Sequence, residues 1–205
     1  MHVLVAGTGA ALLSLDRTLI GQWMVSRPVV LGTALGWVLG DVQTGWWVGL
    51  LLEAISLDTE PVGGVIGLNG TIAVSVTLLA ALGDARLPLG AAFPLGLVFG
   101  LLYRPLEEKL RRRRDGWTGL FASRLREGER APWAKAYVTS FFEEFATAAF
   151  VLTAATFAAT AAAGILWRAA PAFVRVGLED ALAISPLLAA GTLIWQLVRK
   201  ERIGI

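Results

Sequence analysis

The side chains best able to do chemistry in this chain are a few carboxylates and amides inside otherwise apolar sequence. They are Gln22, Asp41, Glu53 and Asn69. A charged side chain at the centre of a membrane helix costs about 2.5–3.5 kcal/mol on insertion scales, so it usually faces an interior or a pathway. Carboxylates accept hydrogen bonds from hydroxyl groups, while amides both donate and accept them. Carboxylates and amides without a cation predict a site for a neutral, polyhydroxylated solute.

Three of these residues also have a purely structural interpretation. Asp41 can cap the helix that follows it. Glu53 can pair with Arg27 or Arg17 and so neutralise a buried charge. Asn69 can bond to neighbouring backbone groups. The sequence leaves both interpretations open.

The composition excludes most catalytic chemistry. The 205 residues include no cysteine and one histidine, His2, so thiolate or histidine-rich metal sites and most histidine relays are excluded. We therefore expect no catalytic residue, metal, cofactor or phosphorylation site in this chain, and no enzyme activity of its own. The net charge of +2 argues against nucleic-acid binding. Only 17% of the residues are charged, against about 25% in an average soluble domain.

Long apolar stretches must position the polar residues. A membrane-spanning helix needs roughly 20 apolar residues, and the sequence predicts an all-α integral membrane protein with five to six membrane segments. The stretches are 3–15, 28–57, 61–83, 87–103, 141–167 and 177–198. The stretch 28–57 is too long for one helix and breaks at Gly40–Asp41, which predicts a re-entrant, broken-helix hairpin. Glu143 and Glu144 are expected to lie at the start of the helix 141–167.

The basic residues divide the chain into three parts. Ten of the 18 Lys and Arg residues fall within 104–135. The parts are a Gly-rich membrane block (1–103), a basic loop (104–135), and a C-terminal membrane helix pair with a basic tail (136–205). Because basic loops favour the cytoplasmic side, the loop and the C-terminus are expected there. The run Arg111–Arg114 is interpreted as a solvated anchor, and Glu107 and Glu108 are placed to pair with it on a helical extension over 106–114.

The run from Ser26 to Leu57 resembles the IIC membrane subunit of the mannose/sorbose family of the bacterial phosphotransferase system (PTS). The matching positions there are Arg27, Pro28, Gly36, Leu39, Gly40, Asp41, Gly45, Gly49, Leu52, Glu53 and Leu57, with Pro61, Gly63, Asn69 and Thr71 downstream. Typical members continue with further apolar segments, so the resemblance implies a form shortened at its C-terminus.

The four-residue glycine spacing also predicts close approach between helix backbones.

The resemblance implies a permease subunit in the inner membrane of a bacterium. Such a IIC subunit translocates a sugar together with a IID membrane subunit, while the phosphocarriers IIA and IIB phosphorylate it, and the complex is an oligomer in the lipid bilayer. We expect the sugar pathway to be lined by Gln22, Asp41, Glu53 and Asn69. Structural motif positions would be Arg27, Pro28, Gly36, Gly40, Gly45, Gly49, Pro61 and Gly63. The alternative is a non-transporting regulatory or scaffolding subunit that docks phosphocarriers through its Arg-rich loop.

Overall fold

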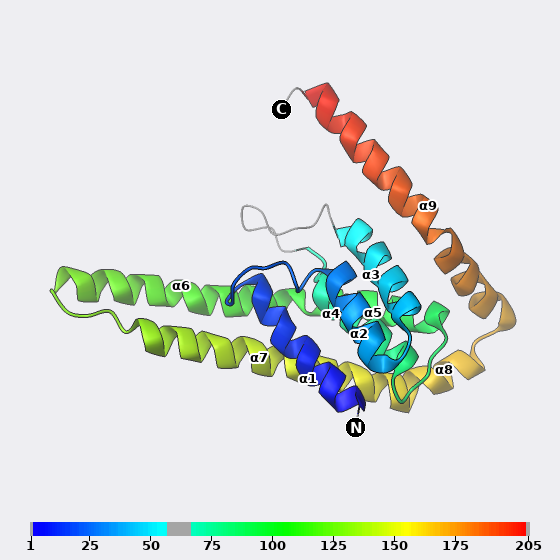
Figure 1. The fold of residues 1–205 in the computed structure, drawn as a ribbon, viewed down its shortest axis with the longest axis horizontal. Helices are drawn as coiled ribbons and strands as arrows, with labels where there is room; N and C mark the ends of the chain where they lie inside the picture. The colour runs from blue at the N-terminus through cyan, green and yellow to red at the C-terminus, as the bar shows by residue number, and fades with distance from the viewer. Residues whose placement is uncertain (1, 57–66, 204–205) are drawn as a thin grey trace.

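The computed structural model describes residues 2–56 and 67–203, whose regular elements are helices, with no strand among these residues (Figure 1). The predicted motif positions Pro61 and Gly63 lie outside the described residues. In chain order the elements are α1 (His2–Ser14), the 3₁₀ turn η1 (Leu15–Arg17), α2 (Pro28–Leu39), α3 (Val42–Ser56), α4 (Gly70–Leu82), α5 (Leu89–Leu102), α6 (Arg104–Arg126), α7 (Trp133–Ala158), the π-helical segment η3 (Ala159–Ala163), α8 (Gly164–Ala169) and α9 (Ala172–Ile203).

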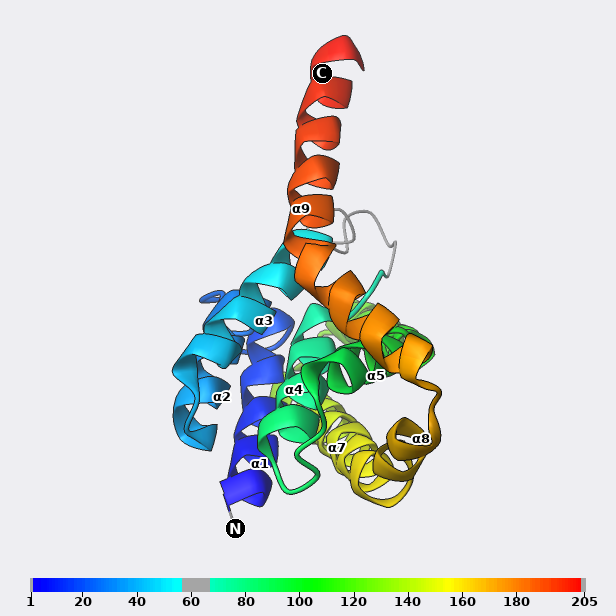
Figure 2. The same cartoon turned by 90° about the vertical axis from the view of Figure 1, so that its right-hand side faces the viewer.

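Helix α4 is the centre around which the other helices pack. Every residue from Gly70 to Ala80 is buried, and α4 contacts α1, α2, α3, α5 and α7 (Figure 2). Its polar side chains find backbone acceptors: the hydroxyl of Ser75 donates to the carbonyl of Thr71 at 2.7 Å, and that of Thr77 donates to the carbonyl of Ala73 at 2.9 Å. A helix that is apolar on all sides is stable only when other helices or lipid surround it.

The stretch 28–57 divides into two short helices at the predicted break. Pro28 stands in the first turn of α2, where its missing N–H is no loss. The helix ends at Gly40, whose φ of 91° is a left-handed conformation that glycine adopts without steric cost. After Gly40 the chain reverses, and α3 packs along α2. The predicted break is thus present, and the two halves of the stretch form a helical hairpin.

Glycines let the backbones of α2 and α3 approach each other closely. A Cβ placed on Gly32 would lie 2.6 Å from the carbonyl oxygen of Gly45, and one on Gly36 would lie 2.8 Å from the Cα of Gly45. A Cβ on Gly49 would lie 2.5 Å from the carbonyl oxygen of Pro28. Real Cβ atoms do not approach backbone this closely, so any larger residue would separate the two helices.

The stretch predicted as a basic loop is mostly a helix. Residues 104–126 form α6, which follows α5 after Tyr103, and α6 packs against α7 as one long hairpin (Figure 1). The helix extends well beyond the predicted 106–114 because residues such as Leu, Glu and Arg favour helix. Within it, Glu107 pairs with Arg111 at 2.7 Å and Glu108 with Arg112 at 2.5 Å, as the four-residue spacing predicts.

Among the described residues, two helical stretches are long and apolar enough to cross a membrane. They are Leu89–Arg126, with 38 residues, and Trp133–Ala169, with 37 residues, while Pro28–Leu39 and Gly70–Leu82 are apolar but shorter. Large aromatic side chains along the outside of α7, at Phe142, Phe150 and Phe157, are exposed. Such an outward apolar stripe is costly in water and favourable in lipid, as expected of a membrane-embedded protein.

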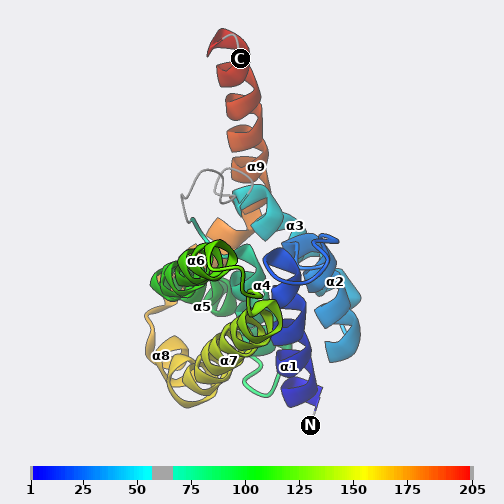
Figure 3. The same ribbon diagram turned by 90° about the vertical axis from the view of Figure 1, so that its left-hand side faces the viewer.

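The C-terminal helix reaches away from the other helices (Figures 2 and 3). The turn between α8 and α9, at Ala170 and Pro171, lies between the predicted stretches 141–167 and 177–198. Helix α9 contacts α3 and α5, and large apolar side chains along it, including Leu187, Leu188 and Trp195, are exposed.

The close α2–α3 contact makes Gly45 sensitive to a single added methyl group. Gly45→Ala is expected to destabilise the fold by about 1–3 kcal/mol, because its Cβ overlaps the carbonyl of Gly32 and the Cα of Gly36. Thermal unfolding in detergent measures the effect. Gly119→Ala on α6 is the matched control, since its Cβ meets nothing within 4 Å. Equal unfolding temperatures for the two variants would contradict the close contact.

Candidate functional site

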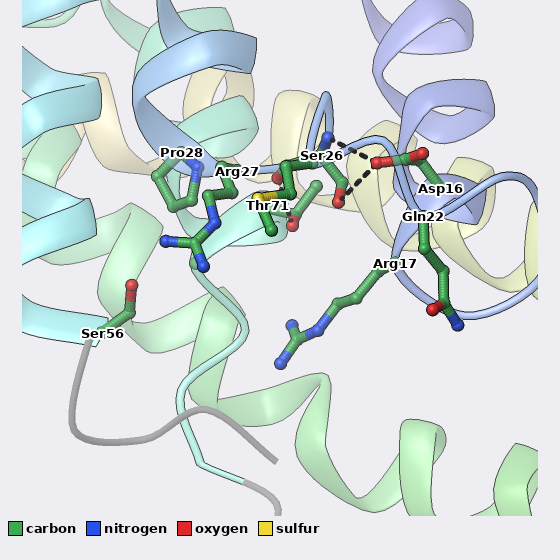
Figure 4. A pocket seen from close by; sticks show the side chains of 10 residues that line it. Asp16, Arg17, Gln22, Ser26, Arg27, Pro28, Ser56 and Thr71 are labelled. Atoms are coloured by element: carbon green, nitrogen blue, oxygen red, sulfur yellow. Dashed lines mark hydrogen bonds between the residues drawn. The ribbon is translucent and has the colours of Figure 1, made fainter. Parts of the chain in front are cut away.

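A polar pocket of about 280 Å³ lies where η1, the start of α2, the end of α3 and the start of α4 converge. Figure 4 shows its side chains. The lining residues are Asp16, Arg17, Gln22, Met24, Ser26, Arg27, Pro28, Ser56, Gly70 and Thr71. Four separate segments of the chain contribute, so the pocket exists only when these helices are packed together.

Asp16 fixes the connection between η1 and α2. One carboxylate oxygen accepts from the backbone N–H of Trp23 at 2.7 Å. The other accepts from the backbone N–H of Ser26 at 3.2 Å and from its hydroxyl at 3.3 Å. Asp16 is buried, and both of its oxygens are occupied. The carboxylate therefore holds the connection in place, and with it the exposed Gln22, whose φ of 52° is left-handed.

Glu53 joins the end of α3 to the start of α2. Its carboxylate pairs with the guanidinium of Arg27 at 2.7 Å and accepts from the backbone N–H of Val29 at 3.4 Å. The side chain of Glu53 is only 14% exposed, whereas that of Arg27 is 39% exposed. The ion pair is the structural alternative that the sequence left open, and it directs Arg27 to the pocket wall (Figure 4).

Asn69 caps α4 and ties it to two other helices. Its side-chain oxygen accepts from the backbone N–H of Ile72 at 3.0 Å, and its amide nitrogen donates to Glu107 on α6 at 3.0 Å. Its backbone N–H donates to the carbonyl of Gly100 on α5 at 3.2 Å. The cap satisfies a helix N–H that has no partner within the helix. Asn69 is buried and holds the start of α4 at the pocket.

Asp41 lies at the other end of the α2–α3 hairpin. It caps α3, accepting from the backbone N–H of Thr44 at 3.0 Å and from its hydroxyl at 2.6 Å. Because α3 has 15 residues, it is about 22 Å long. The structure therefore does not bring Asp41 to the pocket formed at the other end of α3.

The four predicted residues thus hold different positions. Gln22 lines the pocket, Glu53 contacts it through Arg27, Asn69 borders it, and Asp41 lies apart. Sequence reasoning named Arg17 and Arg27 as possible ion-pair partners of Glu53, and Arg27 also as a motif position, but it named neither as a pocket residue. The available signal was their rarity, because Arg17, Arg27 and Arg86 are the only Lys or Arg residues in 1–103. Unlike the predicted set of carboxylates and amides, the pocket also contains two cations, Arg17 and Arg27.

A second polar cluster stabilises the α6–α7 pair. Glu144, with a side chain 6% exposed, pairs with Arg114 at 2.8 Å, and the more exposed Glu143 pairs with Arg113 at 2.9 Å. The prediction that Glu143 and Glu144 start a helix was wrong. The helix begins ten residues earlier, at Trp133. Glu143 and Glu144 are therefore neutralised by arginines of a neighbouring helix rather than by a helix terminus.

Comparisons of the sequence and of the fold with known proteins identify the family of this chain. Residues 1–205 match the family that is described as the sorbose-specific IIC component of the PTS. The chain belongs to this family of IIC components. It is 27% identical over 215 residues to N-acetylgalactosamine permease IIC component 1 of Escherichia coli strain K12, and the match covers 99% of this chain and 78% of that relative. The chain is thus a sugar-specific IIC component of a PTS.

Two solved structures resemble this IIC-family chain. One is described as a membrane protein, with a TM-score of 0.74 and 19% identity over 95% of this chain and 77% of that one. The other is the mannose transporter ManYZ in complex with microcin E492, with a TM-score of 0.60 and 20% identity over the same shares. At these identities the likeness concerns the fold, which is that of a membrane protein.

The arginine run offers a matched pair of substitutions. Arg114→Gln is expected to destabilise the protein by about 3–5 kcal/mol, because it leaves the buried Glu144 without its cation. Arg112→Gln is the control, since Arg112 and Glu108 are largely exposed and such a pair contributes about 0–1 kcal/mol. Thermal or denaturant unfolding in detergent measures both. A loss at Arg112 as large as that at Arg114 would refute the distinction.

Proposed function

We propose that this IIC component forms, together with a IID partner, the sugar pathway of a PTS permease whose substrate is phosphorylated by IIA and IIB. The observation that carries the proposal is the polar pocket formed where four elements of the bundle converge. Hydrogen-bonding side chains from separate helices converge there (Figure 4). The related IIC component named for N-acetylgalactosamine and the solved mannose transporter support a sugar as the cargo. The chain itself would carry no phosphoryl group.

Within this pathway the predicted residues would have separate roles. Gln22 would contact sugar hydroxyls, because its amide lies exposed on the pocket wall. Glu53 would act by holding Arg27, and Asn69 by holding the start of α4. For Asp41 we propose a contribution to the pathway through the hairpin turn that it caps.

The α2–α3 hairpin is proposed to be re-entrant. A helix of 12 residues is about 18 Å long, whereas the hydrocarbon core is about 30 Å thick. Helix α2 therefore cannot span the core alone, and the chain would enter and return on the same side. Backbone breaks at membrane depth are tolerated where protein or a water-filled cavity covers them.

A topology with five to six membrane segments is proposed for the inner membrane of a bacterium. Residues 1–103 would form the sugar-handling block, the basic segment 104–135 would face the cytoplasm, and 136–205 would add the C-terminal helices and a cytoplasmic tail. The concentration of Lys and Arg in 104–135 supports this orientation.

The scaffolding alternative has less support in the geometry. It requires a free basic surface, but the four arginines from Arg111 to Arg114 each form an ion pair with a glutamate. An arginine that is already paired attracts an acidic partner less strongly. We therefore propose transport rather than docking as the role of this chain.

Glu53 provides a test of the pocket. Glu53→Gln is expected to lower sugar uptake at least about tenfold, because Arg27 loses its charged partner and the pocket wall is no longer held. The measurement is uptake of radiolabelled N-acetylgalactosamine, mannose and sorbose by cells that express the complete system. Glu108→Gln, on the exposed part of α6, is the control. Normal uptake by a well-expressed Glu53→Gln variant would refute the assignment.

Gln22→Ala is expected to raise the apparent KM for the transported sugar about tenfold, through the loss of direct hydrogen bonds. Its membrane abundance should not change, because Gln22 is exposed. An unchanged KM would remove Gln22 from the sugar site.

The partner proposal is tested by co-expression with a IID subunit from the same genome. The tagged chain is expected to retain that subunit through detergent purification, and the oligomer is measured by mass photometry. An unrelated multi-pass membrane protein with the same tag is the control. Loss of IID from a chain that remains folded would contradict the proposal.

A further inference from the structure

The connection between η1 and α2 holds two residues with side chains in a left-handed backbone conformation. Gln22 has a φ of 52° and Met24 a φ of 64°, and among the described residues Arg86 is the only other non-glycine residue with a positive φ. In this conformation the Cβ crowds a neighbouring carbonyl oxygen, so the backbone is strained. Strain of this kind persists only where surrounding contacts impose it, and it gathers at ligand sites.

The two strained residues form part of the pocket wall. Gln22 and Met24 both line the pocket, whereas Trp23 between them is not among the lining residues and is 76% exposed. If the connection relaxed to an unstrained conformation, both side chains would change direction, because φ sets the direction of the Cβ relative to the chain. The shape of this wall therefore depends on the group that holds the strain.

Asp16 is the group that holds it. One carboxylate oxygen accepts from the backbone N–H of Trp23, the residue between Gln22 and Met24, at 2.7 Å. The other accepts from the backbone N–H and from the hydroxyl of Ser26, at 3.2 and 3.3 Å (Figure 4). The carboxylate is buried, at 5% exposure. Hydrogen bonds to a carboxylate are roughly twice as strong as bonds between neutral groups, so these bonds can hold a strained turn.

The two ends of the connection are held without Asp16. At its start, the backbone N–H of Leu19 donates to the carbonyl of Leu15 at 2.8 Å. At its end, the carbonyl of Ser26 accepts from the hydroxyl of Thr71 on α4 at 2.8 Å. Weakening the bonds of Asp16 is therefore expected to release the residues between these two anchors and to leave the helix packing in place.

We propose that Asp16 is a positioning residue of the sugar pocket, which acts through the backbone of Trp23 and Ser26 and not by direct contact with the sugar. Both of its oxygens are already occupied, so the sugar would meet the side chains of Gln22 and Met24 instead. The proposal rests on the proposed sugar pathway and adds a cause of its affinity. A wall that is held in place before the sugar arrives loses less conformational entropy on binding.

The first test is the uptake kinetics of Asp16→Asn in cells that express the complete system, with whichever of N-acetylgalactosamine, mannose and sorbose the wild type transports. Asn keeps the size of the side chain and one oxygen, but its amide nitrogen cannot accept from Ser26. The apparent KM is expected to rise about tenfold while the maximal rate stays within about twofold, because a looser wall weakens binding and not the later steps. Asp115→Asn, at an exposed position on α6, is the matched control and should keep the wild-type KM.

The second test measures the strain by thermal unfolding of the full chain in detergent. Glycine adopts a left-handed conformation without steric cost, so Met24→Gly removes the strain at this position. The change in Tm caused by Met24→Gly is expected to be about 2–4 °C more favourable in the wild type than in Asp16→Asn, where the turn is already free to relax. Comparing the two backgrounds cancels the effect of glycine on the unfolded chain.

A further variant covers the case in which Asp16→Asn does not accumulate in the membrane. Asp16→Glu then takes its place in both tests, since the carboxylate persists but its oxygens are displaced by one methylene group. Its KM should rise at least about threefold. An unchanged KM in this variant would also overturn the proposal.

The outcomes separate this proposal from the proposed function. A wild-type KM in Asp16→Asn, or a lower maximal rate at unchanged KM, overturns the positioning role and leaves sugar transport standing. The same change in Tm from Met24→Gly in both backgrounds overturns it as well. Absence of sugar uptake by the wild-type system contradicts the proposed function instead, and the unfolding comparison then decides whether Asp16 holds the turn.

Discussion

The buried start of α4 is the constraint on which the rest of the structure depends. A helix terminus surrounded by protein and lipid must satisfy its polar groups internally, because no bulk water is available. Asn69 does this by accepting from Ile72 while donating to Glu107 and, through its backbone, to Gly100. Two residues later, the hydroxyl of Thr71 donates to the carbonyl of Ser26 at 2.8 Å. One helix start therefore connects α5, α6 and the segment that leads into α2.

The pocket is a consequence of the same junction. Helix α2 begins beside α4 because Thr71 holds Ser26, which Asp16 also binds. Helix α3 returns to this point because glycines let it lie directly against α2, and Glu53 then reaches Arg27. The polar groups that close these contacts are the ones that surround the pocket. Stability and the proposed binding of a sugar would therefore depend on the same few hydrogen bonds, which is why substitutions here need folding controls.

The sequence predicted individual residues well where the interaction was local. The helix break at Gly40, the cap at Asp41 and the pairs from Glu107 and Glu108 to arginines four residues later all follow from short-range geometry. The predictions for Glu143 and Glu144 were wrong because their partners lie 30 residues away on α6. The helix over 104–126 was predicted too short. The reason is that charged residues are equally compatible with a solvated loop and with a solvated helix.

The sequence by itself determined the all-α membrane class and the family, because composition, apolar run length and motif spacing are properties of the chain alone. It could not decide which of the four predicted polar residues meet in one place. Only the tertiary structure separated Asp41 from the pocket, paired Glu53 with Arg27 and left Arg17 facing the same space. The physical reason is that Arg17 and Arg27 could each have paired with Glu53. The packing of α2 on α3 and α4 placed the carboxylate beside Arg27, and among the described residues Arg17 has no ion-pair partner.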